Sequence, residues 1–274
     1  MEEKSMIAVI SKYRKAIMGF AALWILAMHE WRLLIPYGES FWEREVFLKD
    51  IGFCGVDIFL LLSGMGLTYA IKKSGVGRFY FGRIKRILFP YLAVAVIVGV
   101  SYGWSAREFL ANVSGYNFYF KSIYSFMWFV PAILTLYLVF PLYWAVFSRA
   151  KNKTVFTLTV LVIWLLVSMV LRDRLRGDMY GFTNRIPVFL VGVLYGWLCQ
   201  SNRMRESRGL WALTALTLLL GLYLADRTNV DGMYLLVPVS NCCVPNLLIA
   251  MSLPLIMAKL LDLLASFRAT RWLS

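Results

Sequence analysis

A single histidine, His29, stands in the stretch AMHEW, near the end of an apolar run that begins at about residue 16. An imidazole accepts protons near neutral pH, so this residue is a candidate general base. Ionisable groups at membrane depth usually line a cavity or a pathway. A plainer alternative stays open, in which His29 lies among the lipid headgroups and hydrogen-bonds a backbone carbonyl.

A carboxylate, Asp57, interrupts a second apolar run, GVDIFLLLSGMGL. A buried carboxylate is costly unless it is paired, and we expect it to pair with the imidazole of His29 and fix its tautomer. Asp57 can instead cap a helix or meet an arginine. The small residues Ser63 and Gly64, later in the same run, are expected to let two helices pack closely.

A pair of arginines, Arg83 and Arg86, lies in the stretch RFYFGRIKRILFPYL. A spacing of three places both side chains on one side of a helix. Two forked guanidinium groups in that arrangement suit phosphate oxygens. The alternative is ordinary positive charge at the cytoplasmic end of a membrane helix, with the aliphatic stems in lipid.

The elements that carry these residues are predicted to be membrane helices. Apolar residues make up 60% of the 274 residues, more than soluble domains contain. The apolar runs are continuous, and each has about the 20 residues that cross a bilayer as a helix. We therefore predict one all-α, polytopic membrane domain over residues 1–274, with about eight spans. The predicted spans cover residues 16–36, 51–71, 87–104, 125–147, 154–171, 183–199, 209–225 and 235–261.

The basic residues predict the orientation of the chain. With a cytoplasmic N-terminus, most of the 29 lysines and arginines fall on the cytoplasmic side, as the positive-inside rule requires. His29 then lies in the outer third of the membrane. The net charge of +14 reflects this topology and attraction to anionic lipids, so membrane lipids, and no nucleic acid, are the expected partners. The four cysteines lack metal-ligand spacing, and we expect neither a disulfide framework nor a metal.

Five stretches, taken in order, resemble the acyltransferase-3 family of integral-membrane acyltransferases. They are AALWILAMH, GVDIFLLLSGMG, FYFGRIKRILFPYL, MWFVPAILTLYLVFPLYW and RIPVFLVGVLYG. The resemblance covers residues from about 14 to 200, and the remainder matches in hydropathy only. Each stretch alone is only a weak indication of the family, but all five in this order are a fairly specific one.

The resemblance implies an enzyme of ten membrane helices in the plasma or inner membrane. Such enzymes acylate hydroxyls of extracytoplasmic or lipid-linked glycans, with cytoplasmic acyl-CoA, often acetyl-CoA, as the donor substrate and no bound cofactor. The resemblance also implies that His29 is the catalytic histidine and that Asp57 belongs to the second-span motif. Arg83 and Arg86 match the arginine motif associated with the acyl-CoA side.

Three features depart from the family pattern. Met18 stands where the family usually has Arg or Lys, eleven residues before the histidine, and we expect Lys15, one turn earlier, to substitute. Met65 stands where the family usually has Phe. The chain ends at RATRWLS, where family members continue into further helices, so we expect a fragment or a shortened member.

These predictions combine into one mechanism across the membrane. Arg83 and Arg86 hold the CoA phosphates at the cytoplasmic surface while the pantetheine arm carries the thioester inward. His29 takes the proton of an acceptor hydroxyl that arrives from outside, and Asp57 stabilises the imidazolium. Direct transfer and an acyl-enzyme intermediate both stay open.

Three residues, Arg32, Trp128 and Arg185, are expected on the acceptor side, where an aromatic ring beside polar groups suits a sugar. Trp128 can instead anchor the chain at the membrane surface, and Arg32 can bind lipid headgroups. Two other classes stay open: a transporter or lipid-handling protein without covalent chemistry, and an inactive fragment. The sequence names neither the acceptor nor the length of the acyl chain.

Overall fold

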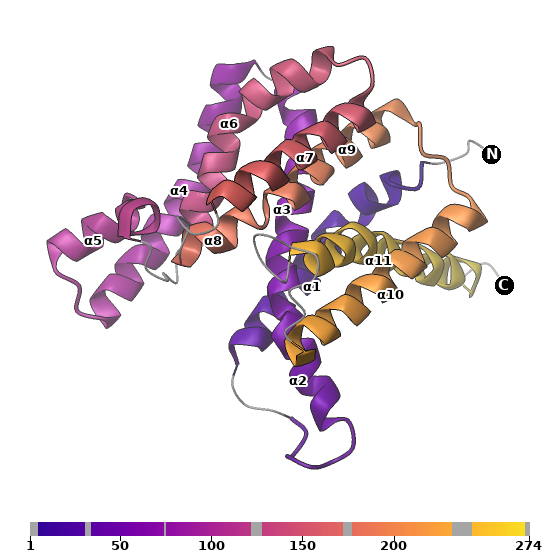
Figure 1. The fold of residues 1–274 in the computed structure, drawn as a ribbon, viewed down its shortest axis with the longest axis horizontal. Coiled ribbons are helices and arrows are strands. Elements are labelled where there is room, and N and C mark those ends of the chain that lie inside the picture. The colour runs from indigo at the N-terminus through magenta and orange to yellow at the C-terminus, as the bar shows by residue number, and fades with distance from the viewer. Residues whose placement is uncertain are drawn as a thin grey trace. The chain divides into compact units, whose positions relative to one another are not determined.

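In a computed structural model of the protein, every regular element of the described residues is a helix (Figure 1). The structure describes residues 5–30, 34–73, 75–121, 128–171, 177–231 and 243–271. The predicted all-α class is confirmed. In chain order the helices are α1 (Ala8–His29), α2 (Trp42–Asp50), the 3-10 helix η1 (Ile51–Phe53), α3 (Cys54–Lys73), α4 (Val76–Ser101), α5 (Ala106–Val113), the π-helix η2 (Asn117–Lys121), α6 (Phe129–Arg149), α7 (Lys153–Leu171), α8 (Gly177–Thr183), α9 (Ile186–Ser201), α10 (Arg208–Asp231) and α11 (Cys243–Arg271).

Among the described residues, six helical segments are long and apolar enough to cross a membrane, and they match six of the eight predicted spans. Of the other two, α7 has a shorter apolar stretch, and α1 carries Lys12, Arg14 and Lys15 in its first half. The protein is a multi-pass membrane protein. The six segments are Trp42–Lys73, Val76–Ser101, Phe129–Arg149, Gly181–Ser201, Arg208–Arg227 and Cys243–Ser266.

The helices divide into two compact units. The first contains Met1–Met65 and Pro187–Ser274, and therefore α1, α2, most of α3, and α9 to α11. The second contains Gly66–Ile186, from the last turns of α3 to α8. Of the predicted site residues, His29 and Asp57 lie in the first unit, whereas the two arginines of α4, Trp128 and Arg185 lie in the second.

Glycines allow the helices of the first unit to pack closely. A Cβ on Gly55 of α3 would lie 2.6 Å from the carbonyl oxygen of Ala21 in α1. A Cβ on Gly64 would lie 2.4 Å from the carbonyl oxygen of Phe189 in α9. Because no side chain fits at either position, α3 meets α1 and α9 at backbone distance. The close packing predicted for Gly64 is confirmed.

Helix α11 completes the first unit by packing against both α1 and α10, and Figure 1 shows α10 (orange) and α11 (yellow) side by side. Apolar side chains from η1, α3, α10 and α11 fill the space between these helices. One polar contact lies within this cluster, where the thiol of Cys54 donates to the side-chain oxygen of Asn246 at 3.7 Å. The buried members of the cluster are Ile51, Cys54, Ala225 and Ile249.

The second unit is built around α4 and α6. The hydroxyl of Tyr80 in α4 donates to the carbonyl of Leu138 in α6 at 2.8 Å, and the rings of Phe79 and Phe140 stack beside this bond. Helix α5 begins with a capping box, in which Ser105 and Glu108 each bond the backbone N–H of the other. The contacts of Tyr80 and Phe79 hold the first half of α4, where Arg83 and Arg86 lie, against α6.

Candidate active site

His29 is the last residue of α1, and its side chain is exposed in the first unit. The helix ends there because Glu30 turns to an extended conformation, although its N–H still donates to the carbonyl of Leu26 at 3.0 Å. An imidazole at this point is open to a reactant, as a general base must be.

Helix α2 anchors the chain that follows His29. The ammonium of Lys49 donates to the carbonyl of Glu30 at 3.3 Å. The carboxylate of Glu45 accepts from the backbone N–H groups of Leu34 and Ile35, both at 2.7 Å. Glu45 and Lys49 also form an ion pair at 3.5 Å, one turn apart on α2. The C-terminal end of α1 is therefore held in place by polar contacts from α2.

Asp57 is fully buried in the first turn of α3, and the contacts of α3 show which way its side chain points. Gly52 and Gly55 face α1. Cys54 and Gly64 face α11 and α9. At about 100° per residue, Asp57 shares the side of Cys54 and Gly64 and is directed away from α1.

The register of α1 and α3 adds a second separation. The two helices run antiparallel, with Gly55 opposite Ala21 and Ile25. Asp57 is therefore level with the middle of α1, about eight residues or about 12 Å along the axis from His29. The structure does not bring His29 and Asp57 together, which corrects the predicted direct pair.

The sequence analysis missed Arg14, which approaches the bundle where Lys15 was expected to do so. The Nη2 atom of Arg14 donates to the carbonyl of Leu62 in α3 at 3.1 Å, whereas Lys15 is exposed. Arg14 precedes Met18 by four residues and so lies on the same face of α1. This four-residue spacing from Met18 was the sequence feature that could have identified Arg14.

Arg83 and Arg86 both lie in the first half of α4, as predicted. Arg83 is half-buried, with its guanidinium carbon 5.9 Å from the centre of the Tyr137 ring, and Arg86 is exposed. The aromatic ring holds one guanidinium through a cation–π contact and leaves its N–H edge able to donate. An anion that approaches this side of α4 can therefore meet two positive groups.

Trp128 and Arg185, which are 57 positions apart in the sequence, meet in the second unit. The guanidinium carbon of Arg185 lies 5.3 Å from the centre of the Trp128 ring, and its Nη1 atom donates to the carbonyl of Gly181 at 2.7 Å. Asn184 is buried next to Arg185 in the chain. The structure thus joins two of the three residues predicted for the acceptor side. The third, Arg32, lies outside the described residues.

The comparison with known families decides the class of protein. The sequence profile described as an acyltransferase domain, that of the acyltransferase-3 family, matches residues 16–274. The chain belongs to the acyltransferase-3 family. No curated protein and no solved structure matches it.

The acyltransferase match reaches further than the resemblance predicted from the sequence, which ended near residue 200. It includes α10 and α11, the two helices that pack together in the first unit. Together with the membrane-length helices, it identifies a membrane acyltransferase. Among the described residues, no group of three or more His, Cys, Asp or Glu side chains is arranged to hold a metal ion.

Proposed function

We propose that this membrane acyltransferase transfers an acyl group, most simply acetyl, from cytoplasmic acyl-CoA to a hydroxyl of an extracytoplasmic or lipid-linked glycan. The observation that carries the proposal is the position of His29. It is the single histidine of the chain, lies within the family match, and is exposed at the end of α1. The proposed location is the plasma or inner membrane, with a cytoplasmic N-terminus.

In the proposed reaction His29 acts as the general base. It removes the proton of the acceptor hydroxyl while the oxygen forms a bond to the thioester carbonyl carbon. The carbon–sulfur bond then breaks, and the proton passes to the departing CoA thiolate. A positioned general base contributes about 10²–10⁴-fold, so the correct placement of the two substrates must supply the rest of the acceleration.

Arg83 and Arg86 are proposed to bind the donor. CoA carries a pyrophosphate and a ribose phosphate, and two guanidinium groups one turn apart on α4 suit such oxygens. The contact of Arg83 with Tyr137 supports this role, because it holds the guanidinium in place before the donor arrives.

Trp128 and Arg185 are proposed to contact the acceptor. An indole ring with a guanidinium 5.3 Å from its centre offers an apolar face beside several hydrogen-bond donors. A sugar has an apolar ring face, which suits the indole, and hydroxyl oxygens, which accept from the guanidinium. Asp57 is not assigned a contact with the reacting atoms, since it is directed to the core between α3, α9 and α11.

The experiment is acyl transfer from labelled acetyl-CoA in membranes that contain the protein, with label counted in extracted surface glycans and glycolipids. His29→Gln should reduce incorporation by about 10²-fold or more while the protein inserts normally. Glu30→Gln, the neighbouring control, should retain activity.

Arg83→Gln and Arg86→Gln test the donor site separately. Each should raise the KM for acetyl-CoA by roughly tenfold, the equivalent of about 1.4 kcal/mol, with a smaller effect on kcat. The control Arg107→Gln replaces an exposed arginine of α5. Transport without acyl transfer would instead leave no label in any glycan, and that result would overturn the proposal.

A further inference from the structure

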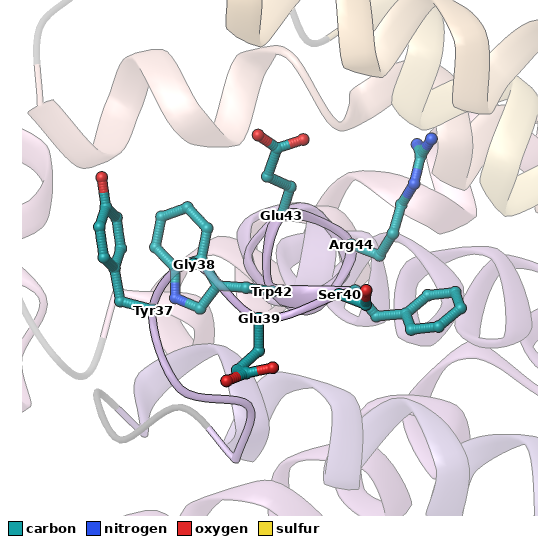
Figure 2. Close-up of a pocket in the computed structure, with 8 residues that line it drawn as sticks. Tyr37, Gly38, Glu39, Ser40, Trp42, Glu43 and Arg44 are labelled. Carbon is teal, nitrogen blue, oxygen red and sulfur yellow. The ribbon is translucent and has the colours of Figure 1, made fainter.

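Two neighbouring pockets surround α2 in the first unit. One, the polar pocket, has a volume of about 520 Å³ and a mixed lining of charged, hydroxyl and aromatic side chains from residues 37–44 (Figure 2). The other, of about 700 Å³, is formed mainly by apolar side chains of α1, α2, α10 and α11. Phe41 and Arg44 line both pockets. Each volume is in the range of ligand sites, and the shared residues make the two pockets neighbours.

The apolar pocket suits a hydrocarbon chain. Leucines from α10 and α11 face one side of α1. Of the charged side chains that α2 adds to this pocket, Glu45 and Lys49 pair with each other, and Arg44 also lines the neighbouring polar pocket. Glu45 is bonded to two backbone N–H groups and to Lys49. The apolar lining consists of Phe20, Trp24, Ala27, Leu34, Ile35, Phe41, Leu48, Ile51, Leu218, Leu222 and Leu253.

The polar pocket lies at the level of lipid headgroups. The helical segment Trp42–Lys73 has 32 residues and so is about 48 Å long, whereas the hydrocarbon core of a bilayer is about 30 Å thick. Its first two turns carry Glu43, Arg44 and Glu45, which place this end outside the hydrocarbon. The apolar pocket lies alongside α1 from Phe20 to Ala27, toward the membrane interior.

The charges of the polar pocket favour a headgroup that carries both signs. Figure 2 shows the side chains of Glu43 and Arg44 extending to the same side of α2, and Glu39 extending to the other. Within the described part of the chain none of these three forms an ion pair. A phosphate can bind Arg44 while an ammonium binds Glu43. A purely anionic headgroup on Arg44 would lie beside the carboxylate of Glu43, at a cost in affinity.

We propose that the two pockets together bind one zwitterionic phospholipid, with its acyl chain among the leucines and its phosphate and ammonium on Arg44 and Glu43. The rings of Tyr37 and Trp42, 4.7 Å apart and nearly perpendicular, add an aromatic wall beside the ammonium. This site is separate from that of His29, because positions 20, 24 and 27 of α1 share one face and position 29 lies on the opposite face. The proposal does not depend on acyl transfer.

The experiment is native mass spectrometry of the full chain released from nanodiscs that contain equal amounts of phosphatidylethanolamine, phosphatidylcholine and phosphatidylglycerol. One zwitterionic lipid should stay bound, in preference to phosphatidylglycerol by about tenfold. Preference for the ethanolamine lipid assigns the ammonium to Glu43, and equal retention of the choline lipid assigns it to the aromatic wall. Equal or greater retention of phosphatidylglycerol would overturn the proposal.

Matched variants locate the lipid. Leu222→Trp fills the apolar pocket and should abolish retention, whereas Leu219→Trp, on the exposed side of α10, should not. Glu43→Lys should shift the preference toward phosphatidylglycerol, because it makes the headgroup site cationic. Lipid that is retained equally by both leucine variants, with no change of preference in Glu43→Lys, is ordinary boundary lipid, and the proposal is then wrong. Helical content and monodispersity of each variant show that it is folded.

Discussion

The carbonyl oxygen of Leu61 in α3 lies so close to Gly192 in α9 that a Cβ on the glycine would fall 2.2 Å from it. The two helices therefore cross at backbone distance, one turn from the buried carboxylate of Asp57. This crossing fixes the rotation of α3, and with it the direction in which Asp57 points.

Gly192→Ala should destabilise the protein by about 1–3 kcal/mol or more, because the new methyl group forces the backbones of α3 and α9 apart. The measurement is thermal unfolding in detergent. Gly82→Ala in α4 is the control, since a Cβ there has nothing within 4 Å, and alanine is the better helix former. Equal melting temperatures for Gly192→Ala and the unmodified protein would contradict the close crossing.

Arg14→Met should lower stability by about 1.5–3 kcal/mol, the usual range for a hydrogen bond that involves a charged group. The same change at the exposed neighbour, Lys15→Met, should have an effect within about 0.5 kcal/mol. Denaturant titration of the two variants provides the comparison. A larger loss from Lys15→Met would restore Lys15 to the role that the sequence analysis gave it.

The helices themselves could be predicted because the apolar runs are long, but α1 shows the limit of a prediction from hydropathy. Hydropathy predicts a start near residue 16, whereas the helix begins at Ala8. Its first two turns are stabilised by contacts that hydropathy does not register: Lys12 and Tyr13 both donate to the carboxylate of Asp262 in α11, at 2.5 and 3.0 Å. Two hundred and more residues separate these partners in the sequence, so only the fold reveals them.

The residues assigned to the candidate site stay predictions, and the sequence did not show which of them lie close together. Depth in the membrane follows from counting residues along a helix, and that placed His29 and Asp57 near each other. The direction of a side chain depends on how a helix is rotated, which its neighbours decide, here through Gly55 and Gly64. The contact between Arg185 and Trp128 likewise depends on how the helices pack, so the sequence did not predict it.

Asp57→Asn should leave the pH dependence of acyl transfer unchanged, because Asp57 is directed away from α1 and does not contact His29. A carboxylate bound directly to the base would instead move the acid limb of the profile by about one pH unit or more when it is removed. The measurement is the rate of acetyl transfer between about pH 5 and pH 9, with His29→Gln as the inactive control. A displaced acid limb in Asp57→Asn would reinstate the direct pair.

Glu206, between α9 and α10, makes the stability of the first unit sensitive to acid. The ammonium of Lys259 in α11 holds the pKa of the Glu206 carboxyl below its usual value, and the indole N–H of Trp211, which donates at 2.8 Å, acts in the same direction. A lowered pKa in the folded state means that the ion pair stabilises the protein above the ordinary pKa of glutamate. That stabilisation is lost as the pH falls through the lowered pKa.

Both side chains of this pair are about one-third exposed, so we expect its contribution to be small, about 0.2–1 kcal/mol. Glu206→Gln should reduce the melting temperature at about pH 6 and reduce it less at about pH 3, because the stabilisation by the ion pair is lost as the pH falls through the lowered pKa of Glu206. Glu39→Gln, which replaces an exposed carboxylate in the loop before α2, should change neither value. A Glu206→Gln variant that is less stable than the unmodified protein by the same amount at both pH values would show that packing of the side chain, rather than its charge, holds the α9–α10 connection against α11.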